Sequence, residues 1–161
     1  MRPFVTIGVY GWTLEPFLDA LREAGVALVL DVRQRRGVRG PEYVWANSQR
    51  LQAALAKAGI GYRHHPELAP TTELRQLQYR EDDRLGVGKR SRSELAPAYR
   101  ERYLREILGQ VDLAPIVEEL PPDAASALLC VERDPEACHR SLIAERLANR
   151  HGLTIRHLRP D

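Results

Sequence analysis

FVTIGVYGWTLEPFLDALREAGVALVLDV, residues 4–32, is the stretch of sequence that decides the fold. Apolar runs with strand character form its two ends, Phe4–Val9 and Val26–Val32, and the second run is apolar enough to be buried on both faces. Between them, Leu14–Ala24 repeats apolar residues at helical spacing. Strand, helix and strand make a β-α-β unit, which places parallel strands in one sheet with helices on its faces.

The alternation of strands and helices continues beyond this unit. Further strands are predicted at Ile60–His64, Ala127–Val131 and Leu153–Leu158, and further helices at 47–58, 97–108, 113–120 and 135–151. Residues 66–92 carry dense charge without clear periodicity and are predicted to form a long loop with one short helix, Thr72–Tyr79. The sequence thus predicts an α/β fold, a single three-layer domain over residues 1–161. Its mostly parallel sheet should have about five strands and helices on both faces.

Length and composition limit the classes of protein to which the chain can belong. At 161 residues, with 43% hydrophobic residues, it is long enough to bury one core. No apolar run approaches the roughly 20 residues of a membrane span, and no signal peptide is evident, so we expect a cytoplasmic protein without a membrane partner. The two cysteines are too few for a disulfide scaffold, and the net charge of +2 does not by itself indicate nucleic-acid binding. The oligomeric state is not determined by the sequence.

Polar and reactive side chains follow each predicted strand, at the place where it ends. In parallel sheets ligands bind beyond the carboxyl ends of the strands, so these residues are expected to share one cleft. They are Tyr10 after the first strand, Asp31 and Arg33 at the second, His64 and His65 at the third, and Cys130 and Glu132 at the fourth. Successive strand residues face opposite sides, so at most one of the two histidines is expected to enter the cleft.

The segment from Cys130 to Arg140 contains both cysteines of the chain. With a helix beginning at Pro135, Cys138 lies in the first helical turn, where the dipole and the neighbouring His139 and Arg140 should lower the pKa of its thiol. Cys130 is either a second candidate nucleophile or a small apolar core residue. Arg140 shares the apolar stripe of the helix and should reach an anion, or a carboxylate such as that of Glu132 or Asp31.

A metal site is the alternative interpretation of these residues. Both cysteines together with His139 or His64 offer zinc ligands, but the cysteines are not separated by the hook of about two to four residues that structural zinc motifs use. The sequence therefore predicts neither a metal nor a cofactor.

A second cluster lies in the loop after the second strand. Tyr43, Trp45 and Asn47 follow a group of arginines that could hold phosphates while the aromatic rings stack on a base: Arg33, Arg35, Arg36 and Arg39. Such a loop is also compatible with an ordinary surface segment.

The chain resembles a bacterial family catalogued as domain of unknown function 488. The residues that carry the resemblance are Thr6-Ile7-Gly8, Leu30-Asp31-Val32-Arg33, Tyr62 with His64 or His65, Cys130-x-Glu132, and Cys138-His139-Arg140 followed by Ile143-Ala144. The resemblance implies a compact α/β domain with a polar cluster at these positions and implies no agreed reaction. A weaker similarity to rhodanese-type sulfurtransferases fails at the loop length, because nine residues separate Cys130 from Arg140.

Two hypotheses for function follow, and the sequence leaves open whether the chain is an enzyme. The first is a small enzyme whose anion-binding cleft acts on a phosphate-bearing substrate, a nucleotide or a nucleic acid, with thiol assistance. Its catalytic candidates are Cys138, Cys130, Glu132 and Asp31, and its candidates for binding the anion or substrate are Arg140, Arg33, His139, His64, Tyr10 and Tyr43. The second is a non-catalytic nucleic-acid or nucleotide binding module in which the cysteine segment only braces the fold.

Overall fold

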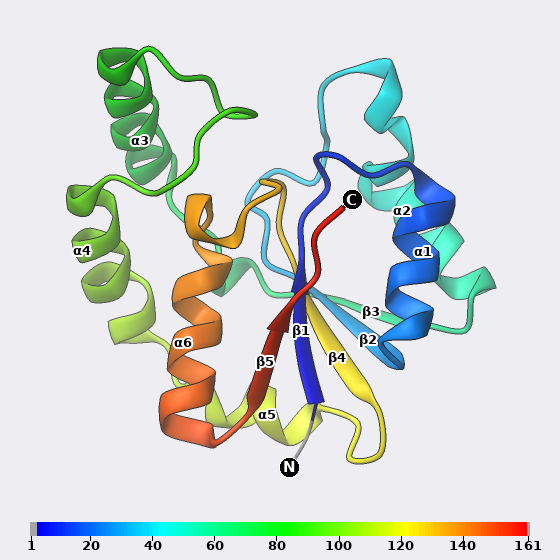
Figure 1. Ribbon diagram of the computed structural model, residues 1–161. Helices are drawn as coiled ribbons and strands as arrows, with labels where there is room; N and C mark the ends of the chain where they lie inside the picture. The colour runs from blue at the N-terminus through cyan, green and yellow to red at the C-terminus, as the bar shows by residue number, and fades with distance from the viewer. Residues whose placement is uncertain (1–2, 161) are drawn as a thin grey trace.

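A five-stranded parallel sheet runs through the centre of the computed structural model, which describes residues 3–160 (Figure 1). The strands are β1 (Pro3–Ile7), β2 (Val26–Asp31), β3 (Gly61–His64), β4 (Ala125–Leu129) and β5 (Thr154–His157). Their order across the sheet is β3-β2-β4-β1-β5, and every neighbouring pair is parallel. The predicted α/β class is confirmed, and the sheet is wholly rather than mostly parallel.

Helices cover both faces of the sheet. They are α1 (Leu14–Glu23), α2 (Ser48–Lys57), α3 (Thr72–Leu85), α4 (Pro97–Glu106), α5 (Ala114–Glu119) and α6 (Arg140–His151). Figure 1 shows α1 and α2 on one side of the strands, and α6 with α3 and α4 on the other. The result is the three-layer arrangement expected from the β-α-β pattern.

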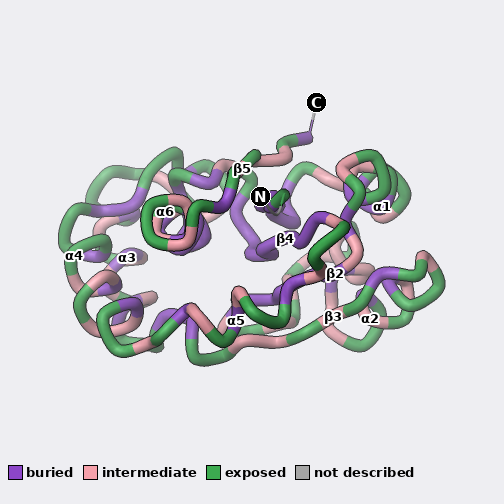
Figure 2. The backbone as a smooth tube through the Cα atoms, turned by 90° about the horizontal axis from the view of Figure 1, so that it is seen from below, coloured by how far each residue is buried: buried purple, intermediate pink, exposed green. Residues whose placement is uncertain are grey.

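Two apolar clusters, one on each face, hold these layers together. Alternate residues of β2 enter them, since Val29 packs with the α1 and α2 side while Leu28 and Leu30 pack with the α6 side. The central strand β4 is buried along its whole length, whereas the edge strands β3 and β5 alternate between exposed and half-buried residues. Figure 2, which looks along the layers, shows the buried stretches between the sheet and the helices.

The order of the strands places a crevice beyond the centre of the sheet. β1 and β4 are neighbours, but the chain leaves β1 for α1 on one face and leaves β4 for α6 on the other. Where neighbouring parallel strands send their connections to opposite faces, the carboxyl ends open into a ligand-binding crevice. The residues that follow β1, β2 and β4 therefore surround one space.

The helix α3 is the largest departure from the predicted elements. It runs over 14 residues, Thr72–Leu85, where only a short helix and a loop were expected. Its buried face contains Gln78 and Asp82 beside Leu74, so the apolar periodicity that identifies a helix is broken by polar residues. Thr71 caps the start through its side chain, and Gly86 ends the helix with a positive φ of 72°.

The helix predicted to begin at Pro135 begins instead at Arg140, and this is a correction. Pro135–Ala137 form a turn of 3₁₀ helix, and Cys138 then adopts an extended conformation. The oxygen of Cys138 accepts hydrogen bonds from both the backbone N–H and the hydroxyl of Ser141, and these bonds start α6. Cys138 therefore lies before the helix and not in its first turn.

No helix within residues 3–160 is long and apolar enough to cross a membrane.

We predict that Gly8→Ala destabilises the protein strongly. An added Cβ would lie 1.8 Å from the backbone oxygen of Glu132, so the crossing of β1 with the loop after β4 would have to open. We expect the free energy of unfolding to fall by about 3 kcal/mol or more, the upper end of the usual cost of overpacking, and urea denaturation measures this loss.

The matched control is Gly61→Ala, whose added Cβ would meet the side chain of Leu28 at 3.3 Å, a contact that a small rotation relieves. Equal losses for the two variants would contradict the close approach at Gly8.

Candidate active site

A cavity of about 680 Å³ lies beyond the carboxyl ends of β1, β2 and β4. Most of its wall comes from three segments: the loop after β2, the helix α3 with the loop that follows it, and the loop between β4 and α6. Tyr10 after β1 and Tyr99 of α4 complete it. Of the residues predicted from the sequence, six line the cavity, namely Tyr10, Arg33, Cys130, Glu132, Cys138 and His139. Asp31, His64, Tyr43 and Arg140 do not.

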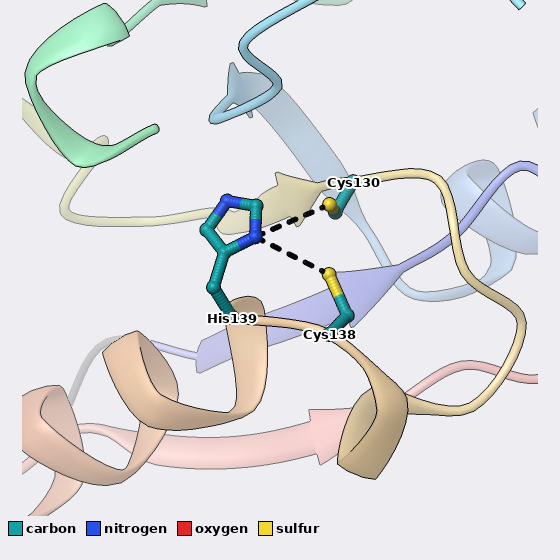
Figure 3. Close-up of side chains that lie close together, drawn as sticks. All are labelled: Cys130, Cys138 and His139. Carbon is teal, nitrogen blue, oxygen red and sulfur yellow. Dashed lines mark hydrogen bonds between the residues drawn. The ribbon is translucent and has the colours of Figure 1, made fainter. Parts of the chain in front are cut away.

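The two cysteines and His139 form a compact cluster in the wall of the cavity (Figure 3). The Nδ1 atom of His139 lies 3.6 Å from the sulfur of Cys130 and 3.6 Å from that of Cys138. On the other side of the ring, Nε2 lies 2.8 Å from the backbone oxygen of Val32. Because a carbonyl oxygen only accepts, Nε2 carries a proton in this hydrogen bond. All three side chains are buried, and both cysteines are free thiols.

The two thiols differ in charge. Burial by itself raises the pKa of Cys138, but a hydrogen bond from Cys130 and the positive charges of His139 and Arg140 outweigh it, so that this pKa lies well below its usual value. Burial, followed by the adjacent Cys138 thiolate, raises the pKa of Cys130 well above its usual value. Burial lowers the pKa of His139, yet the negative Cys138 raises it overall. Cys138 is therefore the thiolate of the pair and Cys130 the thiol.

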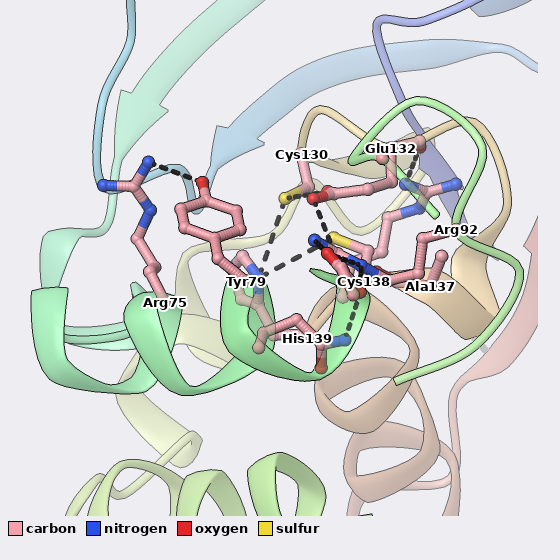
Figure 4. A network of polar contacts seen from close by, with 12 residues as sticks. Arg75, Tyr79, Arg92, Cys130, Glu132, Ala137, Cys138 and His139 are labelled. Atoms are coloured by element: carbon pink, nitrogen blue, oxygen red, sulfur yellow. Dashed lines mark hydrogen bonds and ion pairs between the residues drawn. The ribbon is translucent and has the colours of Figure 1, made fainter. Parts of the chain in front are cut away.

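Glu132 connects this cluster to the basic side of the cavity (Figure 4). One carboxylate oxygen lies 3.5 Å from the sulfur of Cys130, and the other lies 3.3 Å from a guanidinium nitrogen of Arg92. Burial, followed by the charge of Cys138, raises the pKa of Glu132, while Lys89, Arg92 and His139 oppose the rise. Its carboxyl group thus lies between the Cys130 thiol and the guanidinium of Arg92.

Arg92 is the most important residue of the site that the sequence analysis missed. Its guanidinium donates to Asp82 of α3 at 2.8–3.0 Å and to the backbone oxygen of Ala137 at 3.0 Å. Gln78, one helical turn before Asp82, donates to the same carboxylate and accepts from the backbone N–H of Ala96. These bonds attach α3 and the loop after it to the cluster. The only signal in the sequence was the spacing of Gln78 and Asp82, four residues apart.

Arg33 and Asp31 form a buried ion pair whose donors and acceptors are used within the protein. Two nitrogens of Arg33 donate to the two oxygens of Asp31 at 2.9 Å, and a third donates to the oxygen of Ala46 at 2.9 Å. The hydroxyl of Tyr62 donates to Asp31 at 2.5 Å, and burial together with this bond raises the pKa of Tyr62. Asp31 is completely buried, so the pair positions the loop after β2.

The two histidines after β3 lie outside the cavity wall. His64 bonds through Nε2 to the backbone oxygen of Arg33 at 3.0 Å, and His65 pairs with Glu67 at 2.6 Å. Neither histidine therefore lines the cavity, which agrees with the expectation that at most one would, but the candidate His64 does not contact the cavity. β3 is an edge strand of the sheet, and the loop of Arg33 lies between His64 and the cavity.

The expected place of Arg140 also needs correction. Arg140 is completely buried and donates to the backbone oxygens of Glu132 at 2.5 Å and Arg133 at 3.0 Å, and to the Thr6 hydroxyl at 3.2 Å. Because α6 begins at Arg140 itself, this side chain reaches back beneath the loop after β4 instead of across the strand ends. It meets carbonyl oxygens there rather than the carboxylates of Glu132 or Asp31.

Tyr43 supports the cavity from behind. Its ring lies 5.3 Å from that of Tyr10, which lines the cavity, and its hydroxyl accepts from the N–H of Gly11 at 3.1 Å. The guanidinium of Arg90 lies 5.2 Å from the Tyr10 ring and 5.1 Å from the Tyr43 ring, so it holds both by cation–π contact.

The fold and the cavity together define an α/β protein with a sulfur and imidazole cluster at the carboxyl ends of a parallel sheet. The chain belongs to the family described as Domain of unknown function DUF488, whose model matches residues 13–147. The matched range includes the whole segment from Cys130 to Arg140, and the resemblance to this family is confirmed. No curated protein and no solved structure matches the chain.

We predict that the thiols of the metal-free protein differ in reactivity toward iodoacetamide. In Cys130→Ser the remaining Cys138 should react with a pH midpoint below about 8.5, the ordinary thiol value, because the thiolate is the nucleophile. In Cys138→Ser the buried Cys130 should react only above that value. Rates measured from pH 5 to 10 with a chelator present test the assignment, and the opposite order would overturn it.

We further predict that Arg140→Met lowers the free energy of unfolding by about 2–6 kcal/mol, since it leaves two carbonyl oxygens unsatisfied and each costs about 1–3 kcal/mol. Urea denaturation measures the loss. Arg133→Met is the control, because Arg133 is exposed and only its backbone oxygen contacts Arg140. A loss for Arg140→Met as small as that of the control would show that the buried guanidinium does not hold the loop.

Proposed function

We propose that the protein is a small enzyme whose cavity binds a phosphate-bearing substrate, a nucleotide or a nucleic-acid segment, and carries out its reaction at the Cys130, Cys138 and His139 cluster. The observation that carries the proposal is the charge around the cavity. Among the described residues, Glu132 is the one acidic residue that lines the cavity. Seven basic residues line it: Arg33, Arg35, Arg39, Arg75, Lys89, Arg90 and Arg92.

These basic residues fall into two groups. Arg33, Arg90 and Arg92 are each paired with a carboxylate inside the protein. Arg35, Arg39, Arg75 and Lys89 form no ion pair within residues 3–160 and are exposed or half-buried, and we call them the basic rim. A phosphate entering the cavity would meet these uncompensated charges, and arginine favours such groups because it donates two parallel hydrogen bonds.

Aromatic side chains that line the cavity suit a planar group. Tyr10, Tyr79 and Tyr99 line the cavity, and Arg75 donates to the hydroxyl of Tyr79 at 2.9 Å while its guanidinium lies 5.6 Å from the same ring. Stacking of a base on an aromatic ring contributes about 1–3 kcal/mol. A substrate with a base and a phosphate would therefore satisfy both kinds of lining.

The reactive groups are more deeply buried in the cavity than the residues of the basic rim, which are exposed or half-buried. Cys138, Cys130 and His139 are buried there, and Glu132 lies 3.5 Å from Cys130, near enough to act as acid or base for a thiol-assisted reaction. The free thiols of the cluster fit a reducing compartment such as the cytoplasm.

Calorimetric titration with a nucleoside monophosphate, its nucleoside and inorganic phosphate tests the proposal. The monophosphate should bind more tightly than the nucleoside. Lys89→Gln and Arg75→Gln should each weaken its binding about tenfold or more, since a charge-assisted hydrogen bond contributes about 1.5–3 kcal/mol. Arg100→Gln is the matched control, because Arg100 is exposed on α4 and outside the cavity.

Equal binding of nucleoside and monophosphate, or equal binding by the rim variants and the wild type, would refute the proposal. The rival binding module makes a different prediction: long single- or double-stranded nucleic acid should bind with a steep dependence on salt. In that case the Cys130→Ser and Cys138→Ser variants should bind as the wild type does and no substrate should be turned over.

A further inference from the structure

Three atoms of metal-binding type converge at one point of the cavity wall. The sulfurs of Cys130 and Cys138 and the Nδ1 atom of His139 all lie within 4.8 Å of one another, and all three residues are buried. The histidine nitrogen is equally far, 3.6 Å, from each sulfur (Figure 3). An ion pair between one thiolate and the imidazolium would account for one sulfur contact of Nδ1. It does not account for the second contact at the same distance.

The spacing of these atoms matches tetrahedral zinc coordination. With Zn–S bonds of about 2.3 Å, Zn–N bonds of about 2.0–2.1 Å and tetrahedral angles, a sulfur and a nitrogen on the same ion lie about 3.6 Å apart. Both sulfur to nitrogen distances in the cluster have this value. The two sulfur to nitrogen distances are therefore those of ligands that share one zinc ion, and the sulfurs lie within 4.8 Å of each other.

His139 is already oriented as a ligand. The hydrogen bond from Nε2 to the backbone oxygen of Val32, at 2.8 Å, places the proton on the nitrogen that faces away from the sulfurs. In the neutral ring this leaves the lone pair of Nδ1 directed at the cysteines. Zinc-binding histidines are commonly held in this way, by a backbone carbonyl or carboxylate on their second nitrogen.

The charges of the cluster also favour a divalent ion. Two thiolates and a neutral imidazole balance the +2 charge of zinc, so the loaded cluster would be neutral in its buried position. The long separation of Cys130 from Cys138 in the sequence is no obstacle. One follows β4 and the other precedes α6, and the fold closes the loop between them.

We propose that Cys130, Cys138 and His139 bind one Zn²⁺ ion whose fourth position faces the cavity. Three protein ligands with one position open to water or substrate is the arrangement of catalytic zinc sites, whereas structural sites use four protein ligands. The open position would take a water molecule or an oxygen of an anionic ligand. Glu132, beside Cys130, would be the acid or base for that position.

Binding of the ion does not depend on the proposed function. Only the role of the open position rests on it, because that role assumes a phosphate-bearing substrate in the cavity. In the metal-loaded protein the two thiolates would act as ligands and not as nucleophiles.

Metal titration of the full chain tests the site. The reduced, chelator-treated protein should bind one Zn²⁺ per chain in competition with a chromogenic chelator. Co²⁺ in place of Zn²⁺ should give the thiolate charge-transfer band and the intense visible bands of tetrahedral coordination. Loss of a residue that only supports a metal ligand typically lowers metal affinity by roughly 10- to 100-fold. Removal of a ligand itself, in Cys130→Ser, Cys138→Ser or His139→Gln, should lower the affinity for Zn²⁺ by more than this.

His64→Gln is the matched control, since His64 also bonds to a backbone carbonyl through Nε2 but lies outside the cluster. It should bind Zn²⁺ like the wild type, and so should the rim variant Lys89→Gln. If Zn²⁺ binds while Lys89→Gln leaves nucleotide binding unchanged, the proposed function fails and the metal site stands.

The proposal would be overturned if the wild type did not bind Zn²⁺ stoichiometrically. It would also be overturned if the wild type and all three ligand variants bound Zn²⁺ equally well. Should the variants fail to fold, alkylation of the wild type decides. Saturating Zn²⁺ should protect both thiols from iodoacetamide, and Mg²⁺, which prefers oxygen ligands, should not. Unchanged alkylation rates in the presence of Zn²⁺ would likewise rule the site out.

Discussion

The buried guanidinium of Arg140 is the interaction on which the rest of the site depends. It lies at the start of α6 and donates to the two carbonyl oxygens of the loop after β4 and to Thr6 of β1. It therefore fixes the loop that contains both Glu132 and the backbone leading to Cys138. Its positive charge also helps to keep Cys138 ionised. Gly8 permits this arrangement, because any larger residue would strike the same loop.

The charged side chains around Arg140 differ in how deeply they are buried. Arg33 pairs with Asp31 and Arg92 pairs with Asp82, so that the charges within each buried pair cancel. Both pairs hold the walls of the cavity in place. Buried pairs of this kind position groups more than they stabilise a fold. The basic rim lacks such partners within residues 3–160. The cavity thus combines positive charges that are neutralised by buried carboxylates, basic side chains without an ion pair, and the two buried cysteines.

The sequence predicted the strands and most helices because apolar periodicity identifies them when one face is buried. It did not predict the full length of α3, whose buried face contains Gln78 and Asp82, and so it missed the contribution of Arg92. It also placed Arg140 in the cleft, because a helix starting at Pro135 would direct that side chain differently from one starting at Arg140. Six of the ten predicted site residues do line the cavity.

By itself, the sequence determined the parallel α/β fold and the gathering of polar residues at the strand ends, since both follow from local periodicity and from the geometry of β-α-β units. Only the tertiary structure decided which of those residues meet. The extended backbone at Cys138 turns two adjacent residues toward Cys130, and the carbonyl of Val32 orients the imidazole between the sulfurs. The contact between His139 and Val32 joins residues that are 107 apart in the chain, and no local pattern contains it.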